Sequence, residues 1–249
     1  MNGQNWKTIW SGRSANPDMI QSGDPEKIFL ELARSDGYDV VQGQISYESF
    51  LERHNEIKNK LSARLADGQT IQSVFEVGCG SGANLFLMEQ DGIACGGIDY
   101  SSGLIESAKR VLRSEDLHCM EAAKLPVEKR YDASVSIGVF CYFADEQYAS
   151  EVLERMYQKA RYAVGVVDIM DAGKRESYLE HRRAIIPNYE ERYQGLHRMF
   201  YTREFFQQFA ESHGMDIEIT PSGLRGYWND PFIFNRYLYK RQREESRAL

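Results

Sequence analysis

A glycine-rich loop is the first feature of the sequence that could do chemistry. The apolar run 74–77 leads into Gly78, Gly80 and Gly82, and a helical pattern begins at Ala83. Because glycine has no β-carbon, a ligand can lie directly against such a loop, and the free N–H groups that open the next helix point toward a polar or anionic group. The spacing also fits the loose GxGxxG/A pattern of dinucleotide sites, so a nicotinamide cofactor is an alternative.

A carboxylate follows the next apolar run. Asp99 comes about 20 residues after Gly78, where an acidic side chain can accept hydrogen bonds from both hydroxyls of a ribose. The alternative is that Asp99 caps a helix that begins near Ser101. Together the loop and the carboxylate predict a nucleoside site at the ends of the first two strands.

Short apolar runs alternate with helical patterns over the middle of the chain. The runs are expected to form buried strands at 73–77, 93–98, 117–120, 133–137 and 162–167, with helices at 83–90, 103–113 and 146–159. This alternation predicts an α/β fold, a mostly parallel sheet with helices on both faces. Two further runs, 216–220 and 231–239, complete seven strands, and the last strand is expected to be antiparallel.

The chain is expected to form a single domain of 249 residues. Its predicted parts are an N-terminal helical cap at 1–65, a cofactor-binding core at 66–171, a helical lid at 172–200, and a closing helix and strands at 201–249. The cap contains a charged amphipathic helix at 47–65, and the lid contains a helical pattern at 174–185 that ends before Pro187.

Residues 74–144 resemble the class I S-adenosylmethionine (SAM)-dependent methyltransferase family, which has a Rossmann-like sheet. The family's first motif is matched in full by Glu76-x-Gly78-x-Gly80-x-Gly82. The resemblance implies SAM as the cofactor and S-adenosylhomocysteine (SAH) as its product. It implies that the glycines hold the methionine portion, that Glu76 supports its amino group, and that Asp99 binds the ribose.

The resemblance extends to the adenine end of the cofactor. Tyr100 is expected beside the adenine, and the family's Gly-Asp-Ala-x-x-Leu-Pro pattern corresponds to residues 120–126. Here Glu121 replaces the aspartate, which keeps the carboxylate that meets the adenine's amine but lengthens its arm. Ala122 and Ile137 are assigned to the same cofactor site.

Residues 131–142 resemble the family's fourth strand and the turn where methyl donor and acceptor meet. Tyr142 and Cys141 are therefore expected near the transferred methyl group, and Tyr142 is a candidate catalytic residue. Many relatives carry a histidine near Cys141, which this chain lacks. His197 is the predicted general base, with His181 as the second choice and a surface histidine as the alternative reading.

Metal is not expected to take part. Asp168 and Asp171, at the end of the fifth strand, could suggest a metal site as in catechol-type relatives. The Asp-Asn partner pair of that branch is missing.

The composition of the chain limits the kinds of partner that it is expected to bind. The net charge of −7 is the wrong sign for a protein that binds mainly through nucleic-acid phosphates, and no apolar run reaches the length of a membrane span or a signal peptide. The expected partner is a small-molecule acceptor, with no nucleic acid and no membrane. We expect a cytoplasmic monomer or homodimer.

The favoured function is methylation of a small molecule in biosynthesis, at an oxygen atom of a saccharide or secondary metabolite. Three alternatives stay open: an N-methyltransferase of a small molecule, an RNA or protein methyltransferase, and a non-catalytic nucleoside-binding protein. The basic tail 240–243 and the arginines of the lid motivate the second alternative, and the missing histidine near Cys141 motivates the third.

Overall fold

The computed structural model describes residues 5–38, 45–66 and 68–241. Seven strands form one sheet in the order β3-β2-β1-β4-β5-β7-β6. The strands are β1 (Ser73–Val77), β2 (Ala94–Asp99), β3 (Leu117–Cys119), β4 (Tyr131–Ile137), β5 (Ala160–Met170), β6 (Met215–Pro221) and β7 (Ile233–Lys240). β7 is antiparallel to both β5 and β6, and the pairs from β3 to β5 are parallel. The predicted fold class, with its antiparallel last strand, is confirmed.

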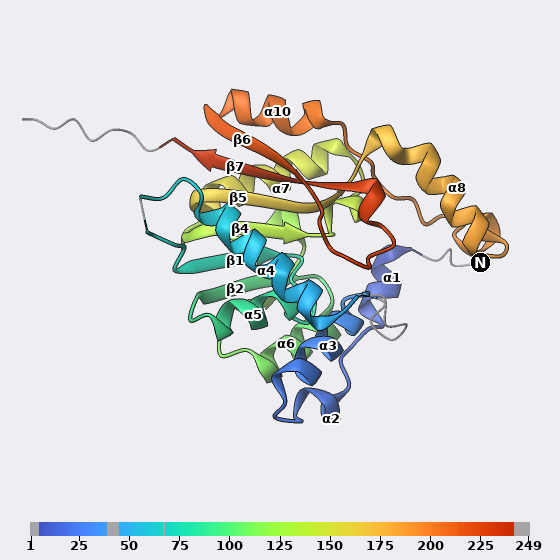
Figure 1. Ribbon diagram of the computed structural model, residues 1–249, viewed down its shortest axis with the longest axis horizontal. Helices are drawn as coiled ribbons and strands as arrows, with labels where there is room; N and C mark the ends of the chain where they lie inside the picture. Colours follow the sequence, from blue (N-terminus) through green and yellow to red (C-terminus); the bar gives the residue numbers. More distant parts are fainter. Residues whose placement is uncertain (1–4, 39–44, 67, 242–249) are drawn as a thin grey trace, which may run out of the picture.

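Helices lie on both faces of the sheet, as Figure 1 shows. They are α1 (Trp6–Ser11), α2 (Pro17–Ile20), α3 (Pro25–Ser35), α4 (Tyr47–Ser62), α5 (Ala83–Gln90), α6 (Ser102–Val111), α7 (Glu146–Lys159), α8 (Arg175–Ile185), α9 (Tyr189–Arg192) and α10 (Arg203–Ser212). Short 3-10 turns at Ala122–Lys124, Phe140–Tyr142, Ala172–Lys174 and Asp230–Phe232 complete the secondary structure. Among the residues described, no helix combines the length and the apolar character needed to cross a bilayer.

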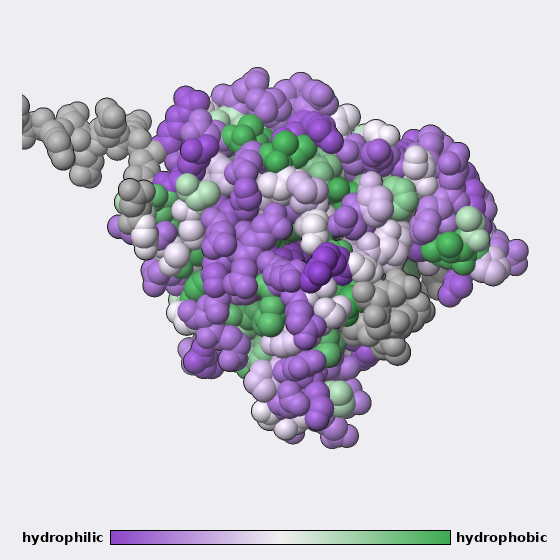
Figure 2. All heavy atoms as spheres, viewed as in Figure 1, coloured by the Kyte–Doolittle hydropathy of each residue, from purple (hydrophilic) through white to green (hydrophobic). Residues whose placement is uncertain are grey.

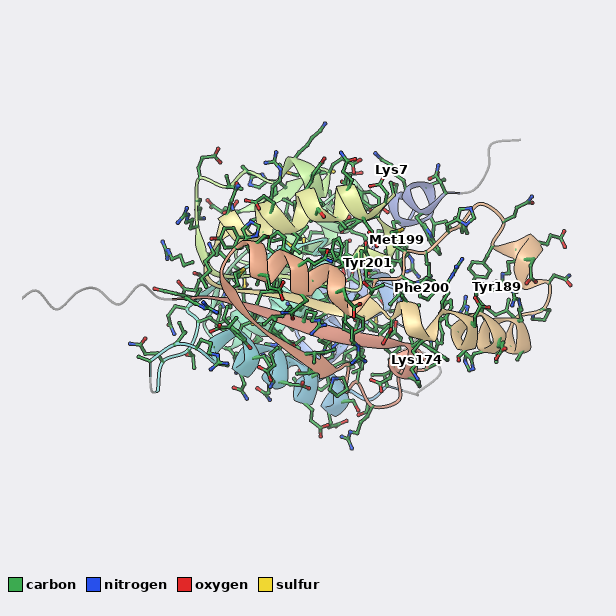
Figure 3. All side chains as sticks on the ribbon, turned by 90° about the horizontal axis from the view of Figure 1, so that it is seen from above. Lys7, Lys174, Tyr189, Met199, Phe200 and Tyr201 are labelled. Atoms are coloured by element: carbon green, nitrogen blue, oxygen red, sulfur yellow. The ribbon has the colours of Figure 1, made fainter. Side chains whose placement is uncertain are left out.

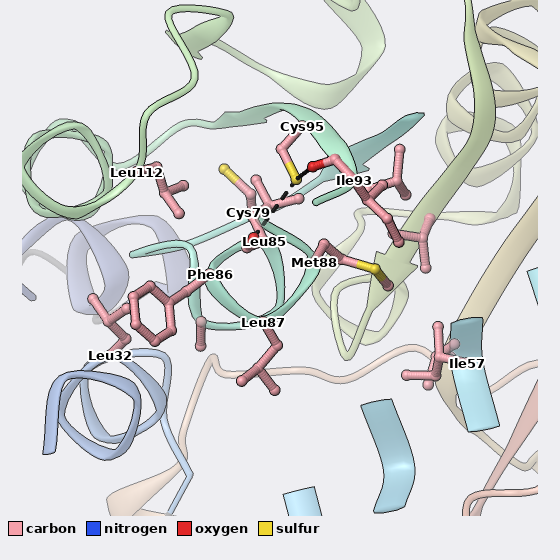
Figure 4. Close-up of a cluster of buried hydrophobic side chains, with 14 of the residues drawn as sticks. Leu32, Ile57, Cys79, Leu85, Phe86, Leu87, Met88, Ile93, Cys95 and Leu112 are labelled. Carbon is pink, nitrogen blue, oxygen red and sulfur yellow. Dashed lines mark hydrogen bonds between the residues drawn. The ribbon is translucent and has the colours of Figure 1, made fainter. Parts of the chain in front are cut away.

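Each face of the sheet buries its own apolar core, because successive residues of a strand point to opposite faces. On one face, α3, α4 and α5 pack over Val74 and Val135, and Figure 4 shows the side chains around α5. On the other, α7 and α10 pack over Phe75, Val77 and Val164. Hydrophilic residues cover most of the molecular surface that is visible in Figure 2.

Three helices precede the amphipathic helix that the sequence predicted. The side chains of Asn5, Asn16 and Asp24 accept hydrogen bonds from the first turns of α1, α2 and α3, and proline opens α2 and α3. These are ordinary helix-start signals. The first part of the chain therefore carries more helix than its asparagines and glycines suggested.

The helices after β5 project from the end of the sheet. α8 and α9 form the outer part of the predicted lid, and the chain then returns to the sheet through residues 199–201, where Met199, Phe200 and Tyr201 are labelled in Figure 3. The return is fixed by an isolated bridge between Asp171 and Tyr201 and by the hydrogen bond from the Tyr201 hydroxyl to the Phe140 carbonyl, at 2.8 Å.

A substitution of Leu61 can test how α4 packs on the sheet. Its side chain is 1% exposed and packs against the backbone of Gly165 in β5. We expect Leu61→Ala to lower the free energy of unfolding by about 2–5 kcal/mol, because the neighbouring residues cannot close the cavity that the lost side-chain atoms leave. Urea denaturation measures the change. Asn59→Ala, at an exposed position of the same helix, is the matched control and should stay within about 0.5 kcal/mol of the wild type. Equal effects of the two substitutions would contradict this packing.

Candidate active site

A cavity of about 430 Å³ opens at the carboxyl ends of β1, β2, β4 and β5. The sheet order reverses between β1 and β4, and ligands of open α/β sheets bind at such a switch point. The wall contains most of the predicted site residues: Glu76, Gly78, Gly80, Asp99, Tyr100, Glu121, Ala122, Ile137, Cys141 and Tyr142. Gly82, His181 and His197 are not among the described residues that line it.

The glycine loop is held in a backbone conformation that side chains rarely adopt. Gly78 and Gly80 have φ values of +75° and +55°. A β-carbon on Gly78 would meet Val139 at 2.3 Å. Gly82, at φ +87°, precedes α5, and its β-carbon would meet Leu112 at 2.8 Å. Gly82 therefore serves close helix packing in this structure, whereas Gly78 and Gly80 face the cavity.

Asp36 supplies the cap that α5 lacks in its own sequence. Its carboxylate accepts hydrogen bonds from the backbone N–H of Ser81 at 2.6 Å and of Ala83 at 3.4 Å. A β-carbon on Gly80 would lie 2.3 Å from Oδ1 of Asp36, so the close approach needs glycine. Burial raises the pKa of Asp36 from 3.8 to about 7.

Asp99 ends β2 beside the same loop. Its Oδ2 accepts from the N–H of Gly80 at 3.1 Å, and its Oδ1 accepts from the N–H of Ser101 at 2.8 Å. The cap of α6 is Ser101, whose hydroxyl accepts from the N–H of Leu104. The alternative role of Asp99 as the helix cap is therefore not observed.

Glu76 lies deeper in the cavity wall and is buried. Its only side-chain partner in the described chain is Asn84, which donates to Oε2 at 3.3 Å. Burial raises its pKa well above the ordinary value, and the nearby charges of Asp36 and Asp99 act in the same direction. Carboxylates crowded in this way favour a cationic ligand.

Helix α1 covers the end of the cavity where Tyr100 and Glu121 lie. Lys7 forms an ion pair with Glu121 at 2.5 Å, and the Tyr100 hydroxyl donates to the Trp6 carbonyl at 3.3 Å. In Figure 3 Lys7 marks the position of α1 beside the chain that returns to the sheet. The Nε1 of Trp6 donates to the backbone carbonyl of His197 at 2.6 Å.

Tyr142 stands in the 3-10 turn after β4, between aromatic neighbours. Its ring meets the rings of Trp6 and Trp10 edge-on, with centroids 4.9 and 5.4 Å away. Burial raises its pKa to about 12. Its hydroxyl is therefore neutral near pH 7 and can donate a hydrogen bond, but it is a weak base.

A buried ion pair that the sequence did not indicate forms another part of the wall. Asp168, at φ +59° near the end of β5, accepts hydrogen bonds from Arg53 at 2.5 Å, from the Ser222 hydroxyl at 3.0 Å and from the Tyr38 hydroxyl at 3.3 Å. Such strained positions cluster at functional sites. Asp168 is thus occupied by Arg53, while Asp171 accepts from the N–H of Gly173 in the next turn.

The structure does not bring the predicted histidine bases to the cavity. The side chain of His197 is exposed, and His181 stacks on Trp228 with ring centroids 5.9 Å apart. A different histidine, His54 of α4, does line the wall. Its Nε2 lies 2.9 Å from Oδ2 of Asp91, and burial lowers its pKa.

Sequence and structure comparisons agree with this geometry. Residues 75–162 match the family model of the methyltransferase domain. With the sheet order and the glycine loop of the first motif, this match confirms the predicted resemblance to SAM-dependent methyltransferases and their class I fold.

Several solved methyltransferases share the fold. Magnesium protoporphyrin IX methyltransferase from Synechocystis PCC 6803 with bound SAH is 16% identical, with a TM-score of 0.58 over 94% of this chain and 97% of that chain. Plantazolicin methyltransferase BpumL, in complex with SAH and a pentazolic substrate analogue, is 18% identical, with a TM-score of 0.59 over 95% and 98%. The N-methyltransferase NodS from Bradyrhizobium japonicum WM9 with SAH is 16% identical, with a TM-score of 0.57 over 88% and 100%. No curated protein sequence matches the chain.

The pKa of Asp36 leads to a pH-dependent prediction. A carboxyl group whose pKa is higher in the folded than in the unfolded chain disfavours folding increasingly as the pH rises between the two values. The free energy of unfolding of the wild type should therefore fall relative to that of Asp36→Asn from pH 3.8 to about 7, and the difference should stay constant above that. Urea denaturation across this range measures both proteins. A difference that does not change with pH would show that Asp36 ionises normally.

Proposed function

We propose that the chain transfers a methyl group from SAM to an oxygen atom of a small acceptor, a saccharide or another secondary metabolite. The observation that carries the proposal is the convergence of the glycine loop, Asp99 and Tyr142 on one cavity. Its volume of about 430 Å³ lies within the range of roughly 300–1,000 Å³ for small-ligand sites.

The donor is proposed to lie along the carboxyl ends of β1, β2 and β4. Its methionine portion would rest on Gly78 and Gly80, its ribose hydroxyls would be accepted by Asp99, and Glu76 would support its amino group. The adenine would lie among Tyr100, Glu121, Ala122 and Ile137. SAH or SAM in the solved structures of similar fold supports this choice of donor.

The chemistry needs positioning more than acid–base help from the protein. Bound SAM supplies an electrophilic methyl group on a sulfonium sulfur. Holding an acceptor oxygen about 3–3.5 Å from that carbon, in line, can contribute on the order of 7–11 kcal/mol. Tyr142 is placed to orient the oxygen through its hydroxyl hydrogen.

The acceptor oxygen must reach the reaction with little help from a base. Asp168, which lines the same cavity, is paired with Arg53, and burial raises the pKa of Cys141 beside Tyr142. An oxygen that is already ionised near pH 7, such as a carboxylate of a sugar acid or of another metabolite, suits such a site, whereas a sugar hydroxyl would need a base. An amine acceptor is the second candidate, because a neutral amine also needs no base, and the fold is shared with an N-methyltransferase.

The ribose assignment of Asp99 can be tested by binding. Asp99→Asn keeps the size of the side chain and one oxygen, which can accept from the N–H of Gly80 or of Ser101. It removes the charge that strengthens hydrogen bonds to the ribose. We expect the dissociation constant of SAH to rise about 10- to 100-fold, a loss of about 1.4–2.8 kcal/mol. Isothermal titration calorimetry measures it. Glu106→Gln, an exposed carboxylate on α6, is the control, and an equal constant for all three proteins would remove Asp99 from the donor site.

Substitutions of Tyr142 and of His197 are expected to have opposite effects on turnover. A screen of small-molecule extracts with radiolabelled SAM supplies an acceptor for the assay. With it, Tyr142→Phe should lower kcat about 10- to 100-fold, because the hydrogen bond that orients the oxygen is lost, while SAH affinity stays within about twofold. His197→Ala should leave kcat and SAH affinity within about twofold of the wild type, because its side chain is exposed away from the cavity wall. The reverse pattern would restore His197 as the base.

A further inference from the structure

Arg198 enters the cavity from the segment between α9 and α10. Its guanidinium lies over the rings of Trp6 and Tyr142, with distances to the ring centroids of 4.9 and 5.0 Å. The side chain is half-buried and lines the cavity. Arg198 is thus a fixed positive charge beside the residue at which donor and acceptor are proposed to meet.

The charge of Arg198 is not neutralised within the part of the chain that the structure describes. Lys7 and Arg53, which also line the cavity, are paired with Glu121 and Asp168. Arg198 has no carboxylate within ion-pair distance among residues 5–38, 45–66 and 68–241, and it donates a hydrogen bond to Sγ of Cys141 at 3.5 Å, a weak acceptor. Removing a charge from water without an opposite charge is costly, so this position suits an anionic ligand.

The surrounding wall is aromatic. Tyr142 and Trp6 flank Arg198, and Tyr227 and Trp228 line the cavity as well. Their rings offer flat apolar faces, on which a planar ring or the face of a sugar can pack. The carboxylates Asp36, Glu76 and Asp99 lie instead where the donor is proposed to bind, and none of them forms an ion pair with Arg198.

We propose that Arg198 binds a carboxylate of the methyl acceptor, whose ring packs against the aromatic wall. This inference rests on the proposed function, since it names the acceptor's chemistry at the same site. Arg is suited to the task because its planar guanidinium can give two parallel hydrogen bonds to one carboxylate. The donor also carries a carboxylate, so the test separates the two sources of negative charge.

Binding of an acceptor can be measured by the fluorescence of the protein's own tryptophans. All three, Trp6, Trp10 and Trp228, line the cavity, so their fluorescence reports on its contents. SAH-loaded protein is titrated with benzoate and its neutral counterpart benzamide, and with glucuronate and its counterpart glucose. We expect at least one carboxylate to bind ten-fold or more tightly than its neutral counterpart, and the pair that responds identifies an aromatic or a sugar ring.

Substitution then assigns the preference to Arg198. Arg198→Met should abolish the preference for the carboxylate, and Arg198→Lys should retain part of it. Arg192→Met, an exposed arginine of α9, is the matched control for net charge and should behave as the wild type. Circular dichroism and SAH binding show whether each variant is folded.

The outcomes are distinct. Neither carboxylate binding more tightly than its counterpart, or a preference that survives in Arg198→Met, would overturn the inference. A ten-fold or larger loss of SAH affinity in Arg198→Met would assign Arg198 to the donor's carboxylate and overturn it as well. Failure of the wild type to bind SAH would instead contradict the proposed donor site, whatever the carboxylates do.

Discussion

The close approach of two carboxylates to the backbone of the glycine loop is the constraint on which the site depends. Asp36 and Asp99 accept hydrogen bonds from the N–H groups of the adjacent residues Ser81 and Gly80. A side chain at Gly80 would collide with Asp36. The loop therefore joins α3, β1 and β2 in one arrangement, which shapes the proposed donor site.

The carboxyl ends of the strands also collect more negative charge than they neutralise. Asp36, Glu76 and Asp99 face one cavity, and burial raises the pKa of each. A sulfonium cation relieves this repulsion, whereas its product SAH lacks the sulfonium charge. The same carboxylates that favour binding of the donor should therefore hold the product less tightly, which suits turnover.

Local pattern predicted the elements, and distance in sequence limited the prediction of the site. The bounds of α5 and α7 agree with the expected helices. The glycine loop ends directly before α5, and Asp145 caps α7, whose buried residues recur at helical spacing. α1, α2 and α3 were missed, although Asn16-Pro17 and Asp24-Pro25 are start signals for short helices. Asp36, Arg53 and Arg198 reach the cavity from segments far from the glycine loop. Only the folded chain brings them there.

The opposite charges along the cavity wall bear on the reaction itself. With the donor beside the carboxylates and an anionic acceptor beside Arg198, a cation and an anion would approach each other under α1, next to the rings of Trp6 and Tyr142. If the acceptor's carboxylate is the methylated group, transfer converts two charged reactants into neutral centres, and a site of low polarity favours that change. If it is only a point of recognition, Arg198 acts through orientation alone. Both cases require that α1 lie over the cavity during transfer, where Trp6 contacts the ring of Tyr142 and donates to the carbonyl of His197.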